Sequence, residues 1–142
     1  MNILVDGSYS PQHKIGVGAY IIIDSDKLKT LENMSIADLK IILSIDISYK
    51  IFKNAKGSTN IEQQILNVAL QDPKIILQKQ SITVYTDCQK TQSNDNYKVE
   101  HVKGHTKQIN RNNNDKIFDV IDKASRKYLR KIIKENYFLF NG

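Results

Sequence analysis

Cysteine is almost absent from this chain, since Cys88 is the only one among 142 residues. A single cysteine excludes a disulfide framework and a zinc site built from several cysteines, and it favours a reducing, cytoplasmic compartment. No apolar run approaches the roughly 18 residues of a membrane-spanning helix. The chain opens directly on a strand pattern, so we expect neither a membrane partner nor a signal peptide.

A phosphate-binding loop is also missing. Gly16 and Gly18 lie close together, but no Gly-Lys-Ser/Thr triplet follows them and no helix pattern begins there. The sequence contains no internal repeat and no linker, and its length is sufficient for one hydrophobic core. We therefore expect a single domain that spans residues 1–142.

The charges are unevenly distributed along the chain. Residues 1–96 contain 10 basic and 10 acidic side chains, whereas residues 97–135 contain 11 basic and 5 acidic ones, which accounts for the net charge of +6. This asymmetry favours an anionic partner, nucleic acid first, although a solvated lysine-rich face would have the same composition. Candidate phosphate contacts on the last predicted helix are Lys116, Lys123, Arg126, Lys127, Arg130, Lys131 and Lys134.

Hydrophobic periodicity predicts an α/β fold. Strand patterns cover residues 2–9, 16–24, 45–52, 81–87 and 97–102. Helix patterns cover residues 36–43, 61–71 and 113–135, and the rest of residues 25–57 is hard to interpret. This order predicts a five-stranded mixed sheet: an antiparallel three-strand meander followed by parallel strands, with helices packed on the faces.

Two of the predicted helices begin with capping signals. Ser35 precedes one helix and Asp38 lies in its first turn, where a negative charge is favourable. Thr59 and Glu62 have the spacing of a capping box, in which a hydroxyl and a carboxylate satisfy the first amides of a helix. On that interpretation Glu62 would be a structural residue.

Two aspartates adjoin strand patterns that are rich in β-branched residues. Asp6 follows residues 3–5 and precedes Gly7, where the backbone can turn sharply or a ligand can come close. Asp87 follows residues 81–86 in the same way. A carboxylate beside a buried strand is costly unless a positive group meets it. If the two strands are parallel neighbours, both carboxylates emerge at one sheet edge, where ligands bind in such sheets.

Two further acids would complete a metal site. Glu62 lies one turn into a helix that would cover the sheet, and Asp115 lies at the start of the last helix. Converging carboxylates repel one another, and hard divalent cations such as Mg²⁺ relieve this repulsion. Two such ions about 4 Å apart stabilise the attacking and leaving oxygens of a phosphoryl displacement. Asp119, and three residues later Asp122, are alternatives to Asp115, which we favour for its spacing from His105.

Taken in order, these segments resemble those of the type 1 ribonuclease H family. Its members carry Asp-Gly-Ser, a helical Glu, Thr-Asp-Ser-Gln, and Val-Lys-Gly-His followed by an Asp. The matching segments here are Val5-Asp6-Gly7-Ser8, Glu62 with Val68-Ala69-Leu70, Tyr85-Thr86-Asp87-Cys88-Gln89, and Val102-Lys103-Gly104-His105 with Asp115. The resemblance covers nearly the whole chain. It implies that two Mg²⁺ ions, or Mn²⁺ instead, are bound by Asp6, Glu62, Asp87 and Asp115.

The reaction that the resemblance implies is endonucleolytic hydrolysis of the RNA strand of an RNA–DNA hybrid, which leaves 3′-hydroxyl and 5′-phosphate ends. His105 would assist proton transfer or product release. Recognition of the RNA 2′-hydroxyl would fall to Gly7, Ser8, Ser58 and Thr59, and Gln89 would contact the substrate.

Three features depart from the family. The asparagine pair ahead of the helical Glu is replaced by Ser58-Thr59-Asn60, and residues 25–57 are longer than usual. Only nine residues separate Asp87 from Tyr97, where many relatives carry helices and a basic handle. That separation is short for a crossover between parallel strands.

Two other functions are compatible with the same scaffold: a catalytically silent nucleic-acid-binding domain and a structure-selective DNA nuclease such as a junction resolvase. A binding domain gains nothing from four acids that face phosphates, and the Lys103-Gly104-His105 loop argues against a resolvase. We expect a monomer, with a dimer through the apolar tail Tyr137–Phe140 as the alternative.

Overall fold

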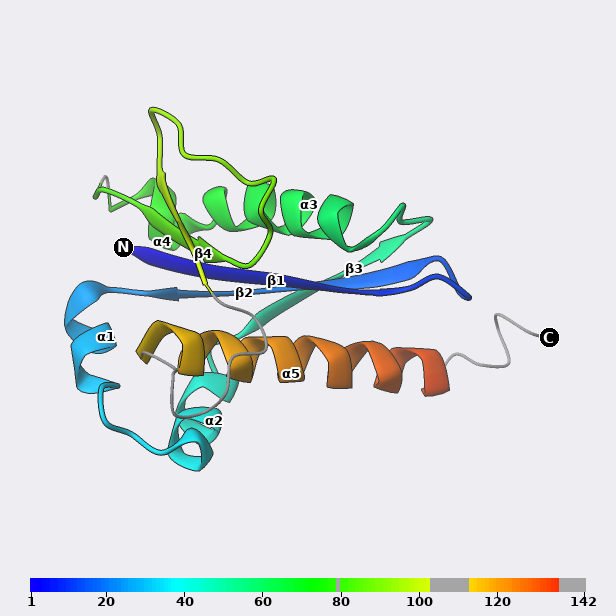
Figure 1. The fold of residues 1–142 in the computed structure, drawn as a ribbon, viewed down its shortest axis with the longest axis horizontal. Coiled ribbons are helices and arrows are strands. Elements are labelled where there is room, and N and C mark those ends of the chain that lie inside the picture. Colours follow the sequence, from blue (N-terminus) through cyan, green and yellow to red (C-terminus); the bar gives the residue numbers. More distant parts are fainter. Residues whose placement is uncertain (79, 103–112, 136–142) are drawn as a thin grey trace.

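The computed structural model describes residues 1–78, 80–102 and 113–135, and its strands form one five-stranded sheet (Figure 1). The strands are β1 (Asn2–Ser10), β2 (Ile15–Ile23), β3 (Ser48–Lys53), β4 (Thr83–Thr86) and β5 (Lys98–His101), in the spatial order β3-β2-β1-β4-β5. The pairs β3–β2 and β2–β1 are antiparallel, whereas β1–β4 and β4–β5 are parallel. The mixed sheet predicted from the sequence is confirmed.

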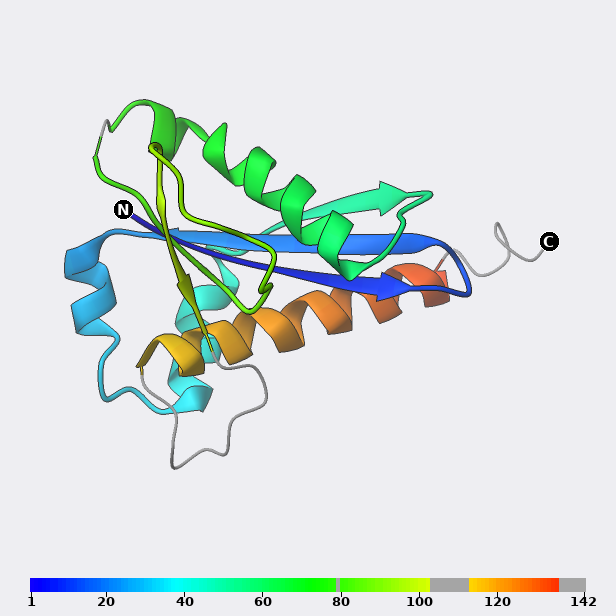
Figure 2. The same ribbon diagram turned by 45° about the horizontal axis from the view of Figure 1, so that its top comes forward.

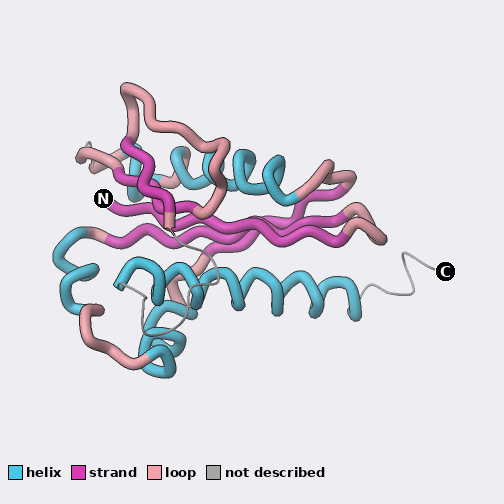
Figure 3. The backbone as a smooth tube through the Cα atoms, viewed as in Figure 1, coloured by secondary structure: helices cyan, strands magenta, loops and turns pink. Residues whose placement is uncertain are grey.

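Helices cover both faces of this sheet. They are α1 (Ser25–Thr30), α2 (Ile36–Ser44), α3 (Ser58–Leu70), α4 (Pro73–Ile76) and α5 (Asn113–Glu135). Helices α3 and α4 lie on one face, and α1, α2 and α5 lie on the other (Figure 3). The turned view in Figure 2 shows α5 running along β1 and β2. In none of the three described ranges is a helix both long enough and apolar enough to cross a membrane.

The central strand β1 is buried on both faces. Its residues alternate, so that Ile3 and Val5 join the core beneath α3, whereas Leu4 joins the core beneath α5 with Ile117 and Ile121. Burial on both sides explains why the strand reads as a continuous apolar run rather than as an alternating one. The same alternation places Asp6 on the face covered by α5, in line with Leu4.

Glycines in β1 and β2 allow α3 to approach the sheet closely. A Cβ atom added at Gly18 would lie 2.6 Å from Cβ of Ile65, and one added at Gly7 would lie 3.0 Å from Cγ of Glu62. Gly16 and Gly18, which carry no phosphate-loop signature, therefore form a packing surface for α3. Gly7 does not turn the chain, because β1 continues to Ser10, one residue beyond the strand pattern over residues 2–9, and it is instead a point where α3 comes close.

Residues 25–57 contain three elements: α2, which was predicted; β3, which begins three residues after the predicted start; and α1, which the hydrophobic periodicity does not reveal. Ser35 caps α2 as predicted, because its hydroxyl accepts a hydrogen bond of 3.1 Å from the amide of Asp38. Helix α1 has no fully buried residue, so its sequence carries no apolar stripe. Strand β3 begins at Ser48 instead of Ile45, which is 86% exposed.

The capping box predicted at the start of α3 is wrong. The helix begins at Ser58, and its N-cap is Gly57, which makes no side-chain cap hydrogen bond and has a φ of 147°. Glycine suits this backbone conformation, which other residues rarely adopt. Glu62 therefore has no capping role and lies beyond the first turn, on the side of α3 that meets the sheet.

The connection between the parallel strands β4 and β5 is short and contains no helix over the described residues 87–97. Side chains within the connection accept hydrogen bonds from its backbone amides and from an amide of β5. Asn94 accepts hydrogen bonds from the amides of Asn96 at 2.8 Å and Tyr97 at 3.1 Å, and Ser93 accepts one of 2.8 Å from Val99. His105 and the apolar segment Tyr137–Phe140 lie outside the described residues.

The close seating of α3 generates a prediction about stability. Substitution Gly18→Ala should lower the free energy of unfolding by about 1–3 kcal/mol, because the added methyl group would overlap the backbone-proximal Cβ of Ile65 and displace the helix. Urea unfolding monitored by circular dichroism measures the change. A variant as stable as the wild type would contradict this account of the glycines.

Candidate functional site

Asp6 and Asp87 are neighbours because β1 and β4 pair in parallel. Leu4 lies opposite Tyr85, and extending this register by two residues sets Asp6 opposite Asp87. The hydroxyl of Thr86, which is fully buried, accepts a hydrogen bond of 3.1 Å from the amide of Cys88. This bond fixes the backbone where Asp87 leaves the strand.

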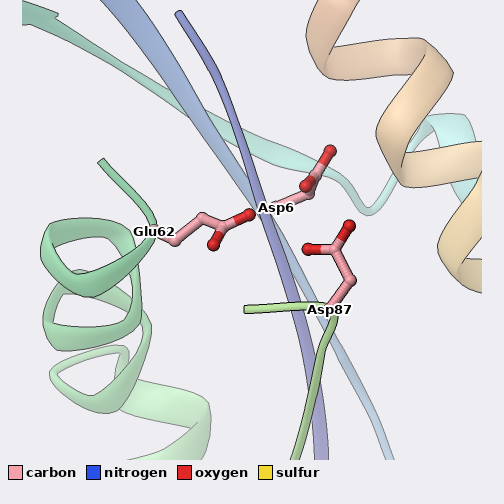
Figure 4. A group of neighbouring side chains, drawn as sticks. All are labelled: Asp6, Glu62 and Asp87. Carbon is pink, nitrogen blue, oxygen red and sulfur yellow. The ribbon is translucent and has the colours of Figure 1, made fainter. Parts of the chain in front are cut away.

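Glu62 reaches the same place from α3. Figure 4 shows the carboxylates of Glu62 and Asp87 pointing toward Asp6 from the helix and from the end of β4. One ligand oxygen from each of the three acids can be chosen so that all lie within 4.8 Å of one another. Asp6 and Glu62 are only 2% and 7% exposed. The structure thus brings together three of the four acids expected at the site.

The acid that α5 adds beside Asp6 is Asp122, not Asp115. Asp122 lines the same cavity as the three other acids, and its Oδ1 lies 3.2 Å from Nε of Arg126. Asp115 is buried but is not among the described residues that line this cavity. The two residues are two helical turns apart, about 10 Å along the axis. Asp119, the other alternative, forms an ion pair of 2.9 Å with Lys123.

Our expectation for Asp115 depended on its spacing from His105, and that spacing is a poor guide to position along a helix. The available signal was the helical period. Asp122, Ser125, Arg126 and Leu129 are spaced i, i+3, i+4 and i+7, which places them on one face of α5.

A pair of buried hydroxyls holds Asp6 in place. Oγ of Ser125, which is fully buried, lies 3.2 Å from Oδ2 of Asp6, to which it donates a hydrogen bond. Oγ of Ser8 lies 2.8 Å from Oγ of Ser125 and can donate a hydrogen bond to it, so that two hydrogen bonds in series link Ser8, Ser125 and Asp6. Ser8 was expected to contact substrate, but it also ties β1 to α5 and orients the central acid.

Burial and mutual repulsion raise the pKa values of the central acids. The pKa of Asp6 lies well above its usual value, first because of burial, then because of the neighbouring carboxylate of Asp122 and the charges of Asp87 and Glu62. Burial, followed by the charge of Asp87, raises the pKa of Glu62 to about 9. A hard cation with oxygen ligands would relieve this repulsion and keep the acids ionised, so the donor set fits a divalent metal.

The acids line a cavity of about 690 Å³. Its walls contain all five residues expected to contact substrate: Gly7, Ser8, Ser58, Thr59 and Gln89. They also contain Arg126 and Arg130, which are two of the candidate phosphate contacts, and three residues that the sequence did not single out: Tyr9, Lys90 and Leu129. The cavity therefore combines an acidic cluster with basic side chains, an arrangement suited to an anionic ligand that is bound together with cations.

Comparisons of the chain with models of known protein families, with curated proteins and with solved structures give no match. The function of the site must therefore be inferred from its own residues and their geometry.

The raised pKa of Glu62 predicts a pH-dependent stability. In the unfolded chain Glu62 loses its proton near its usual pKa of 4.5, whereas the folded, metal-free protein retains it up to about pH 9. Folding then binds a proton, so stability falls as pH rises between these values. The substitution Glu62→Gln removes this contribution, and its stability relative to wild type should rise by a few kcal/mol between pH 5 and 8, at up to about 1.4 kcal/mol per pH unit.

Urea unfolding in chelator at several pH values measures this difference. Glu32→Gln removes an exposed carboxylate and serves as the control for the loss of one acid. If the stability difference between Glu62→Gln and wild type did not change with pH, the acids would not repel one another as described.

Proposed function

We propose that this chain is a metal-dependent endoribonuclease that hydrolyses the RNA strand of RNA–DNA hybrids and leaves 3′-hydroxyl and 5′-phosphate ends. The observation that carries the proposal is the meeting of Asp6, Glu62 and Asp87, from three distant segments, with oxygens within 4.8 Å of one another. The order of the strands and the resemblance of the sequence segments to type 1 ribonucleases H support it.

Asp6, Glu62, Asp87 and Asp122 would hold the divalent cations, Mg²⁺ or Mn²⁺. Bound cations of this kind lower the pKa of water and stabilise charge on the leaving oxygen. The contribution of the chain itself is to hold the carboxylates in position. Ser125 orients Asp6 through its hydrogen bond, and Arg126 orients Asp122 through their ion pair.

The walls of the cavity would position the hybrid. Ser58 and Thr59, at the start of α3, offer hydroxyls and free helix amides to the RNA 2′-hydroxyl and phosphate. Across the cavity, Arg126 and Arg130 offer charge-assisted hydrogen bonds to phosphate. His105 retains its proposed part in proton transfer or product release.

The first test is cleavage of a labelled RNA–DNA hybrid with Mg²⁺ or Mn²⁺. Asp6→Asn, Asp87→Asn and Asp122→Asn should each lower the cleavage rate at least about 100-fold, because each removes a ligand charge at nearly constant shape. Asp115→Asn is the matched control and should retain most of the activity, because Asp115 does not line the cavity.

Other substrates distinguish the alternatives in the same assay. Cleavage of four-way DNA junctions with no cleavage of hybrid would identify a DNA nuclease, and hybrid binding without cleavage would identify a silent binding domain. Loss of activity in Asp115→Asn, with Asp122→Asn unaffected, would restore the assignment first made from the sequence. Thermal melts in chelator show whether an inactive variant is still folded.

The second test concerns the basic side chains of α5, which divide between two surfaces. Arg126 and Arg130 line the cavity with the acids, whereas Lys123 and Lys127 line only a separate groove beside α2, which Arg130 also borders. Replacing both arginines with Gln should reduce the salt slope of hybrid binding by about 1.4–1.8, at 0.7 to 0.9 for each phosphate contact.

Replacing Lys123 and Lys127 with Gln is the control, since it removes the same charge from the same helix. Its salt slope should stay close to that of the parent. Binding is measured by fluorescence anisotropy on the Asp87→Asn background, so that the hybrid is not consumed. Equal slopes for the two double variants would mean that α5 attracts the hybrid only through its overall charge.

A further inference from the structure

A second groove, of about 660 Å³, lies between α2 and α5. Its apolar lining is formed by Ile47, Tyr49, Val120, Ala124 and Tyr128. The rings of Tyr49 and Tyr128 are stacked, with centroids 4.4 Å apart and an angle of 11° between their planes. In Figure 2, α2 lies next to α5 on the face of the sheet opposite α3. The groove is thus a preformed apolar surface outside the acidic site.

The charged residues that line this groove are all basic. They are Lys40 from α2, with Lys123, Lys127, Arg130 and Lys131 from α5. Lys123 forms its ion pair with Asp119, and Nζ of Lys131 lies 4.0 Å from Glu135. Five cations against these two acidic partners leave the rim of the groove positively charged.

Two large aliphatic side chains of α2 and its C-cap are exposed to solvent and adjoin groove residues in the sequence. Leu39 and Leu43 are buried, but Ile41 and Ile45, each one position after a groove residue, are 70% and 86% exposed. Aliphatic side chains exposed beside an apolar groove are typical of a protein interaction surface.

We propose that this groove binds an acidic, amphipathic segment of another protein. Apolar side chains of the segment would fill the groove and cover Ile41 and Ile45, while its Asp and Glu side chains would pair with the lysines at the rim. Protein interfaces commonly have an apolar centre and a polar rim. An amphipathic helix that lies in a groove matches both, because its apolar side chains fill the groove and its charged side chains lie at the rim. Binding here does not involve the acids and does not rest on the proposed hydrolysis, although Arg130 lines both the groove and the acidic cavity.

Two other occupants fit the groove less well. A nucleic acid would satisfy the lysines, but it offers little to exposed isoleucines, and the tyrosine rings are already stacked on each other. A second copy of the chain would bring one basic rim against another, and like charges across an interface are costly.

The test measures binding of designed peptides to the full chain by fluorescence anisotropy. The probe is a labelled helical peptide of Leu and Glu, with Leu at positions i, i+3, i+4 and i+7 and Glu elsewhere. One control peptide has the same composition in scrambled order, and a second has Lys in place of Glu. The amphipathic acidic peptide should bind at least about tenfold more tightly than either control.

Variants locate the binding on the protein. Lys127→Glu with Lys131→Glu should weaken binding of the probe at least about tenfold through charge reversal, and Ile45→Asp should weaken it several-fold. Lys74→Glu with Lys134→Glu makes the same change of net charge at exposed sites outside the groove and should leave the affinity within about twofold. All of these side chains are exposed, so the variants should fold.

Several results would overturn the proposal. One is equal binding of the amphipathic and scrambled acidic peptides, and another is equal weakening by the groove and control variants. Competition by single-stranded oligothymidine that depends on Lys127 and Lys131 would assign the groove to nucleic acid. Self-association abolished by Ile45→Asp would assign it to a second copy, and tighter peptide binding after Phe138→Ser and Phe140→Ser would assign it to the chain's own terminal segment.

Discussion

The repulsion among buried carboxylates is the constraint on which the rest of this structure depends. Asp6 and Glu62 are almost completely buried beside Asp87 and Asp122, so burial and the neighbouring charges make ionisation of Asp6 and Glu62 unfavourable. Such a cluster lowers the stability of the metal-free fold. The sheet and the helices packed on it hold the cluster in place, and its carboxylate oxygens are ligands of the kind that hard divalent cations prefer.

The framework fixes the acids from several independent directions. The parallel pairing of β1 with β4 sets Asp6 opposite Asp87, the glycines beneath α3 bring Glu62 to the sheet, and the Ser8–Ser125 pair ties α5 to β1. None of these contacts is itself charged. The backbone around the site is therefore held by sheet register, packing and a neutral hydrogen bond, and these contacts do not depend on whether the acids are protonated.

The elements with strong hydrophobic periodicity, and the acids that adjoin the strands, could be predicted from the sequence. The register that brings Asp6 and Asp87 together follows from two neighbouring parallel strands, and apolar runs reveal such strands. The sequence could not show which of Asp115, Asp119 and Asp122 lies beside Asp6, because three aspartates on one helix differ only in axial position and angle, which packing decides. Helix α1 was missed because it buries no residue fully, and the capping box was wrong because Gly57 provided an alternative helix start. Local sequence patterns thus identified the candidate acids and helix starts, and tertiary contacts determine which of these candidates the fold uses.

The central claim, that the carboxylates form a binding site for divalent cations, is tested most directly by anomalous diffraction from crystals of the protein soaked in Mn²⁺. We predict an anomalous peak bounded by Asp6, Glu62, Asp87 and Asp122, with loss of that peak in crystals of Asp6→Asn. Crystals saturated with Mn²⁺ that show no peak at these carboxylates, or a peak at Asp115 instead, would contradict the account.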